Sequence, residues 1–358
     1  MGRLNRAAAA LLLASIGLAP FPAAAQVQTS VPAIVPDARP VTVERIKVHA
    51  AAIEGNLEGE SADRDVIVVL PPGYAANPHK RYPVVYALHG YSIGVEQWIR
   101  EIHVPQVVEG AFALGAKPVI LVLPDSKTLH NGSMYSSSPT TGDFERFIAH
   151  DLVAYIDGHY RTLAKRESRG LVGHSMGGYG ATRIGMRHAD VFGAVYMMSP
   201  CCLSARDSGM LDAAAIAQLK GVTSRDAATA LPWGLRATLA AAAAWSPNPK
   251  APPLYLDLPI GDEKQRADVL AKWAANAPLA FIDQYIDDLR RYRAIAIDVG
   301  DKDSLRFDAQ KLHEQLDRYG IANRFTLYAG DHTSAVADRF QNHVLPFFST
   351  HLDFGTAR

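Results

Sequence analysis

The chain has 358 residues, of which 48% are hydrophobic and 20% are charged, so it has enough apolar material for a large folded core. Its 36 basic and 36 acidic residues give a formal net charge of zero, which removes the electrostatic reason to expect a nucleic acid or an anionic membrane as a partner. The balance points to a small or neutral substrate.

The first 25 residues have the composition of a secretory signal peptide. Arg3 and Arg6 precede an apolar run over 7–18, and three alanines ending at Ala25 supply a small-residue cleavage site. The apolar run is short of the roughly 20 residues that span a bilayer, so a membrane anchor is the less favoured alternative. We therefore expect cleavage near Ala25 and export to the periplasm or the medium.

The rest of the chain divides into an extended leader and one large folded domain. Residues 26–40 are rich in Pro, Val and Ala without periodicity, whereas residues 41–358 show alternating strands and helices. Strands are predicted at 41–50, 64–70, 82–88, 118–123, 170–173, 193–199, 294–299 and 324–328, and helices at 144–160, 179–187, 308–319 and 334–345. Most of these strands are nearly continuous in apolar residues, so the pattern predicts an α/β fold with a mostly parallel sheet covered by helices on both faces.

The alternation stops between about Leu203 and Leu289. This stretch is rich in alanine and helical in bias, is interrupted by prolines, and contains one candidate short strand at Leu254–Leu258. The sheet pattern resumes at Ala294, so we interpret residues 203–289 as an insertion above the sheet and not as an independent domain.

We expect this insertion to form a helical cap over the active site, because both of its attachments lie at the sheet edge where catalytic loops gather. Trp233, Trp245 and Tyr255 are candidates for the wall of a substrate pocket in the cap. The alternative is that these aromatic residues only fill the cap's own core.

The stretch Gly173-His174-Ser175-Met176-Gly177 has the G-x-S-x-G pattern of a nucleophile elbow. A serine held at a sharp turn between strand and helix needs neighbours without a Cβ atom, which the two glycines provide. The pattern arises by chance in roughly one such chain in ten. Here a predicted strand precedes it and a predicted helix follows it, so the sequence predicts Ser175 as a nucleophile.

A serine nucleophile needs a base and an acid, which follow it in the chain order serine, acid, histidine in this architecture. His332 directly follows the predicted strand 324–328 and a short turn, so it is the histidine placed to reach Ser175. We expect the other histidines to be structural.

Three aspartates lie at or after the end of the predicted strand 294–299. Asp298 is still within the strand and is expected to be structural, whereas Asp303 lies past a glycine turn, where its carboxylate can fold back to an imidazole. We favour Asp303 as the acid and keep Asp301 as the alternative.

The remaining catalytic group is an oxyanion hole made of two backbone N–H groups, one after the nucleophile and one from the loop after an early strand. These positions fall on Met176 and Tyr91. The adjacent Cys201 and Cys202 would form a strained ring if oxidised, so we expect them to line a pocket as small apolar groups. No histidine and cysteine spacing supports a metal site, and we expect no metal and no cofactor.

The ordered set of motifs resembles the esterase family of α/β-hydrolases that includes S-formylglutathione hydrolase (esterase D), feruloyl esterases, enterochelin esterases and mycolyltransferases. The motifs that carry the resemblance are at 70–74, 82–90, 123–125, 173–178 and 298–303. It implies an α/β-hydrolase fold, a triad of Ser175, Asp303 and His332, and an oxyanion hole from the amides of Tyr91 and Met176. The long insertion and the absence of a tryptophan after His332 depart from the family pattern.

We interpret the chain as an exported serine esterase that cleaves a small-molecule or polysaccharide-linked carboxylic ester through an acyl-enzyme, with no nucleic acid partner and no membrane partner after signal cleavage. An acyltransferase of mycolyltransferase type would use the same groups with a different acceptor. A non-catalytic binding module is the remaining alternative, although it would not need three triad residues in order.

Overall fold

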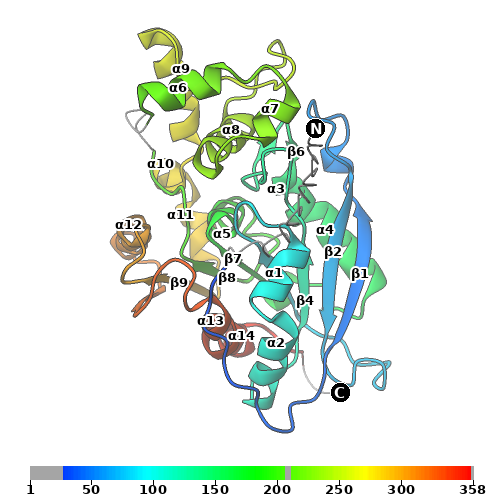
Figure 1. Ribbon diagram of the computed structural model, residues 1–358. Helices are drawn as coiled ribbons and strands as arrows, with labels where there is room; N and C mark the ends of the chain where they lie inside the picture. The colour runs from blue at the N-terminus through cyan, green and yellow to red at the C-terminus, as the bar shows by residue number, and fades with distance from the viewer. Residues whose placement is uncertain (1–26, 206–210, 356–358) are drawn as a thin grey trace, which may run out of the picture.

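The computed structural model describes residues 27–205 and 211–355, so the predicted signal peptide lies outside the described residues. Across those ranges the main sheet has eight strands in the order β1-β2-β4-β3-β7-β8-β9-β10. They are β1 Thr42–His49, β2 Asp63–Leu70, β3 Val84–Leu88, β4 Ile120–Pro124, β7 Arg169–His174, β8 Ala194–Met198, β9 Ala294–Gly300 and β10 Arg324–Tyr328. Figure 1 shows helices on both sides of this sheet.

The strands β3, β4, β7, β8, β9 and β10 pair in parallel, whereas β2 runs antiparallel to its neighbours β1 and β4. Every residue of β3, β4 and β8 is buried. A strand buried on both faces needs apolar side chains at every position, which is the pattern that the sequence shows. The predicted α/β fold with a mostly parallel sheet is confirmed.

Two layers of helices cover the two faces of the sheet. The first layer contains α3 Phe144–Arg146, a π-helical turn Phe147–Asp151, α4 Leu152–His159, α5 Met176–Arg187 and α12 Arg306–Arg318. The second contains α1 Val95–Glu101, α2 Val104–Ala113, α13 Val336–Arg339, a π-helical turn Phe340–Val344 and α14 Leu345–His351. Along β2, Val66 and Val68 pack in the core under the first layer, and Ile67 and Val69 pack under the second.

The described residues of the insertion, 203–205 and 211–289, are called the cap below and form six α-helices, of which the last two pack against α5 in the first layer. They are α6 Ala213–Lys220, α7 Arg225–Thr229, α8 Trp233–Trp245, α9 Glu263–Ala275, α10 Pro278–Phe281 and α11 Ile286–Arg290. Figure 1 shows α6 to α9 together at one end of the molecule, and a small core that includes Leu219, Leu239 and Leu254 holds them together.

The candidate strand at Leu254–Leu258 does not form. Tyr255 has a φ of 53°, which interrupts an extended backbone. A single antiparallel bridge between Pro247 and Leu256 is what remains of the predicted pairing in this described part of the cap.

Candidate active site

The turn between β7 and α5 carries Ser175 in a strained backbone conformation, with φ 59° and ψ −114°. A methyl group on Gly173 would overlap the carbonyl oxygen of Gly177, and one on Gly177 would overlap the carbonyl oxygen of Leu88. The two glycines therefore allow β7, α5 and β3 to approach closely enough to hold the serine at the turn.

Two hydrogen bonds join Ser175, His332 and Asp303. His332 Nε2 lies 2.9 Å from Ser175 Oγ, and His332 Nδ1 lies 2.7 Å from Asp303 Oδ2. Burial of the Asp303 carboxyl disfavours its charge, but the hydrogen bonds from His332 and from the backbone N–H of Leu305 outweigh burial and lower the pKa of Asp303. The ionised carboxylate can only accept, so Nδ1 carries the proton and Nε2 faces the serine hydroxyl as an acceptor.

The three aspartates around the end of β9 have different partners. Asp301 is exposed and accepts a hydrogen bond at 3.0 Å from the backbone of the loop before His332. Asp298 is fully buried and pairs with Arg339, whose Nε lies 2.8 Å from Oδ2. The structure therefore brings Asp303, and not Asp301, to the imidazole of His332.

His174 contacts this group, although the sequence analysis assigned it no role. It is buried, and its Nε2 lies 2.8 Å from the backbone carbonyl oxygen of His332. Burial is the main cause that lowers the pKa of His174 to about 3, so the ring stays neutral. A carbonyl oxygen can only accept, so Nε2 carries the proton and His174 holds the backbone of the loop in place. The feature of the sequence that could have indicated this role is the position of His174 directly before the nucleophile.

The loop after β3 brings Tyr91 beside the nucleophile. A Cβ added to Gly90 would lie 3.6 Å from the Ser175 Cβ, so the backbone here is in close reach of the serine. His89 Nδ1 donates to the Gly90 carbonyl oxygen at 2.8 Å, which fixes the loop. Met176 is the first residue of α5, where a backbone N–H has no partner within the helix. The two residues predicted to supply oxyanion donors thus flank Ser175, and their donor role stays a prediction.

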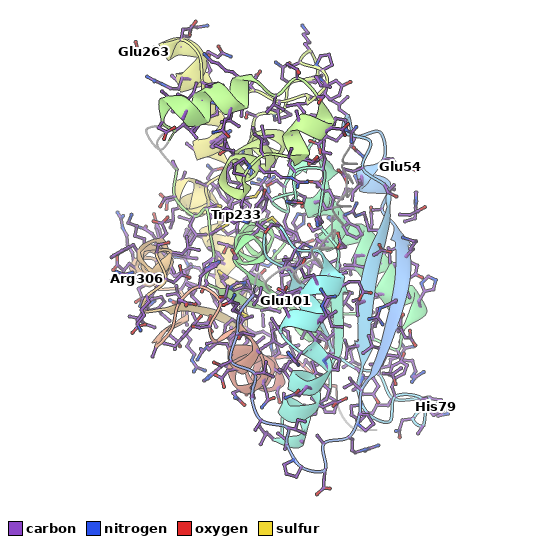
Figure 2. The ribbon with its side chains drawn as sticks, viewed as in Figure 1. Glu54, His79, Glu101, Trp233, Glu263 and Arg306 are labelled. Carbon is purple, nitrogen blue, oxygen red and sulfur yellow. The ribbon has the colours of Figure 1, made fainter. Side chains whose placement is uncertain are left out.

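A cavity of about 1230 Å³ lies between the sheet and the cap, with Ser175 and His332 in its wall. The cap contributes Trp233, Trp245 and Trp273 to the wall. Figure 2 shows Trp233 where the cap meets the rest of the molecule, whereas Glu263 lies at the cap's far end. The cavity is therefore broad, and its cap side is mostly apolar, with three tryptophans among smaller aliphatic side chains.

Tyr255 is not among the residues that line this cavity, so its predicted place in the substrate pocket is wrong. Its turned backbone is instead held against the small hairpin of β5 Ser137–Ser138 and β6 Gly142–Asp143, where Thr140 Oγ1 donates to the Tyr255 carbonyl oxygen at 2.6 Å. Cys201 and Cys202 do line the cavity, and the Cys201 N–H donates to the Ser175 carbonyl oxygen at 3.1 Å.

Within residues 27–205 and 211–355, no three side chains of His, Cys, Asp or Glu are grouped so that they could hold a metal ion. No helix in the same part of the chain has the length and apolar character needed to cross a membrane.

One family model and several curated proteins match this chain. A family model described as “Putative esterase” matches residues 60–346. Esterase Rv1288 of Mycobacterium tuberculosis is 29% identical over 151 residues, which covers 41% of this chain and 31% of that protein. The chain therefore spans less than a third of the length of this curated relative.

Solved structures agree on the fold. A ferulic acid esterase is 23% identical with a TM-score of 0.62, over 88% of this chain and 100% of the other. The S-formylglutathione hydrolase FrmB of Staphylococcus aureus is 14% identical with a TM-score of 0.56, over 87% of this chain and 99% of the other. Both are α/β-hydrolases, and the fold described above is the α/β-hydrolase fold.

Proposed function

The chain belongs to the “Putative esterase” family, and from this premise we propose that it hydrolyses carboxylic esters with Ser175, His332 and Asp303 as its catalytic triad. The observation that carries the proposal is the continuous hydrogen-bond chain from Asp303 through His332 to Ser175. In this arrangement the Ser175 hydroxyl faces the acceptor nitrogen of an imidazole, and a carboxylate holds that imidazole in orientation. This is an arrangement that activates a serine nucleophile.

The proposed reaction has two stages. His332 Nε2 takes the proton of Ser175 Oγ as the oxygen attacks the ester carbonyl, and the amides of Tyr91 and Met176 donate to the developing oxyanion. His332 then gives the proton to the departing alcohol, which leaves the acyl group on Ser175. A water molecule, deprotonated by His332, attacks the carbonyl carbon of this acyl-enzyme. The bond from that carbon to Ser175 Oγ then breaks, His332 returns the proton to Oγ, and the acid is released.

The test is the loss of both turnover and covalent labelling in one variant. Ser175→Ala should hydrolyse p-nitrophenyl acetate at most about 10⁻³ as fast as the wild type, and it should not react with a fluorophosphonate probe. Ser204→Ala is a matched control, because Ser204 also lines the cavity but bonds to Asp308 (Oγ to Oδ1, 2.8 Å). Substantial turnover by pure, folded Ser175→Ala would reject the proposal.

We further propose that the substrate carries an aromatic acyl group of the feruloyl type. The three cap tryptophans at 233, 245 and 273 give the cavity flat apolar surfaces on which a ring can stack. A ferulic acid esterase is also among the proteins with the same fold. A higher kcat/KM for methyl ferulate than for methyl esters of aliphatic acids is the expected result, and the opposite order would reject this substrate class while leaving the esterase proposal intact.

Export is a separate proposal, based on the sequence of the first 25 residues. Expression of the full chain in a Gram-negative bacterium should yield a periplasmic protein whose mass is that of a chain beginning at Gln26. An unprocessed protein confined to the cytoplasm would reject export without affecting the catalytic assignment.

A further inference from the structure

Residues 27–32, called the N-terminal strap below, lie against the loop that carries His332. The Ser30 N–H donates to the Ser334 carbonyl oxygen at 2.8 Å. The Ala337 N–H donates to Thr29 Oγ1 at 3.0 Å, across 308 positions of the chain. Ala337 lies in the first turn of α13, and the residue before that helix makes no side-chain cap. Thr29 therefore provides a partner for a helix N–H that otherwise has none within the helix.

The second helical layer fixes the other side of the strap. The Val27 N–H donates to Glu101 Oε2 of α1 at 2.9 Å, and Gln106 Nε2 of α2 donates to the Pro32 carbonyl oxygen at 2.7 Å. Figure 2 labels Glu101 on α1, and Figure 1 shows the dark blue strap running beside α13 and α2. Val27 itself is 6% exposed and forms part of the cavity wall. The strap thus connects α1 and α2 with the histidine loop.

Contacts with other parts of the chain hold the backbone of the histidine loop. The His332 side chain is 37% exposed, and its ring can keep its bonds to Asp303 and Ser175 only while the backbone that carries it stays in place. Three carbonyl groups of this loop accept hydrogen bonds from elsewhere: that of Gly330 from Lys302, that of His332 from His174, and that of Ser334 from Ser30. A displacement of about 1 Å in a catalytic group can cost about 100-fold in rate.

We infer that the N-terminal strap is a positioning element of the active site, which holds the His332 loop in the geometry that catalysis requires. This inference rests on the proposed function, because it takes His332 as the base. Val27 lines the cavity, but Thr29 and Ser30 bond to the histidine loop and to the start of α13 and not to the reacting atoms. Its effect is expected in kcat and not in substrate binding.

The test removes one hydrogen-bond donor. Ser30→Pro lacks the N–H that reaches Ser334, and Ser30→Ala keeps this N–H and is the matched control. The Ser30 side chain is exposed and the strap has no regular secondary structure, so proline interrupts no helix or strand, and its Cδ replaces the hydrogen that points at the Ser334 carbonyl oxygen. In the full chain, Ser30→Pro should lower kcat about tenfold or more and leave KM within about twofold, while Ser30→Ala matches the wild type. The rate at which a fluorophosphonate labels Ser175 should fall in parallel with kcat.

A second variant keeps the test decisive if proline prevents folding. Thr29→Val preserves the side-chain shape but removes the oxygen that accepts from Ala337, and it should lower kcat in the same direction while lowering Tm by no more than about 4 °C. Wild-type kcat and labelling rates in folded Ser30→Pro overturn the inference, as does wild-type kcat in Thr29→Val if Ser30→Pro does not fold. An equal loss in Ser30→Ala also overturns it.

Ser175→Ala, measured in parallel, separates this inference from the proposed function. An inactive Ser175→Ala beside a fully active Ser30→Pro rejects the role of the strap alone. An active Ser175→Ala rejects the proposed function, and the positioning role falls with it.

Discussion

His174 donates a hydrogen bond from Nε2 to the backbone carbonyl oxygen of His332 at 2.8 Å, and the centroids of the two rings lie 4.8 Å apart. The two histidines have different surroundings. His174 is buried and stays neutral because burial lowers its pKa to about 3, whereas the His332 side chain is 37% exposed at the cavity. One ring is therefore suited to holding the backbone, and the other to exchanging a proton with substrate.

Acid should destabilise the protein through His174. Its pKa is about 3 in the folded chain and near 6.5 in the unfolded chain, so between these pH values the unfolded state binds a proton that the folded state does not. The free energy of unfolding should therefore fall as the pH drops through this window, by up to about 1.4 kcal/mol per pH unit. His174→Gln retains a side-chain donor without titrating, so urea denaturation from pH 7 to pH 4 should show a shallower decline. Identical pH slopes in the two proteins would contradict this.

The choice between the two candidate acids can be made by substitution. Asp303→Asn should lower kcat on the order of 10⁴-fold, because the amide can donate to Nδ1 and favour the wrong imidazole tautomer. Asp301→Asn is the matched control and should cost far less, since Asp301 bonds to the backbone of the loop and not to the ring. Steady-state kinetics on p-nitrophenyl acetate with circular dichroism of both variants provide the comparison, and the reverse ranking would transfer the role to Asp301.

Glu145 should make the first helical layer acid-sensitive. Its oxygens lie 2.6 Å from Arg183 Nε and 2.7 Å from Arg187 Nε. Burial alone would raise the pKa of Glu145, but the hydrogen bond with His188 and the charges of the two arginines lower it to about 2. A depressed carboxyl pKa stabilises the fold fully above about pH 4.5, and this contribution is lost as the pH falls from about 4.5 to about 2.

Removing the Glu145 charge tests the same cluster at neutral pH. Glu145→Gln should lower the free energy of unfolding by about 3 kcal/mol, because it leaves Arg183 buried without its counter-charge. Glu96→Gln is the control, since Glu96 forms an exposed pair with Arg45, and it should change stability by less than about 1 kcal/mol. If the two variants lower the free energy of unfolding equally in urea denaturation, the burial of Glu145 does not determine its contribution to stability.

The sequence predicted best what depends on neighbours along the chain. The buried strands are recognisable because parallel strands covered on both faces need continuous apolar runs, and Ser175 because its strained turn needs Gly173 and Gly177. The closeness of Asp303 and His332 to Ser175 could be predicted from their positions after β9 and β10, since the ends of parallel strands meet at one edge of the sheet.

Features that depend on distant contacts were missed. No element was predicted between β3 and β4, where α1 and α2 meet at His103, a residue with φ 51°, although Pro105 in the first turn of α2 is a signal for a helix start. The role of His174 rests on a contact 158 residues away. Tyr255 was placed in the pocket because it is aromatic and in the cap, but a turned backbone decides which way it faces.

Two of the three cap tryptophans that line the cavity, Trp233 and Trp245, should have separable roles. Trp233 begins α8 and is 63% exposed; its ring lies edge-on to Tyr91 at 5.3 Å, and its Nε1 donates to Ser92 Oγ at 2.9 Å. Trp245 ends α8, where its Nε1 donates to Ser136 Oγ at 3.1 Å and its ring packs against Tyr179 and Trp273. The first contacts the loop of the expected oxyanion hole, and the second joins the cap to the layer below.

Trp233→Ala should therefore change the ranking of kcat/KM among p-nitrophenyl esters of increasing chain length and methyl ferulate, with Tm within about 2 °C of the wild type. Trp245→Ala should also lower the free energy of unfolding, by about 3 kcal/mol, because it removes a large side chain from a packed seam. Trp233→Phe keeps an aromatic ring beside Tyr91 but loses the donor to Ser92. It therefore separates the contribution of the ring surface to selectivity from that of the hydrogen bond. An unchanged ranking in both alanine variants, with normal thermal unfolding, would mean that the cap does not select the substrate.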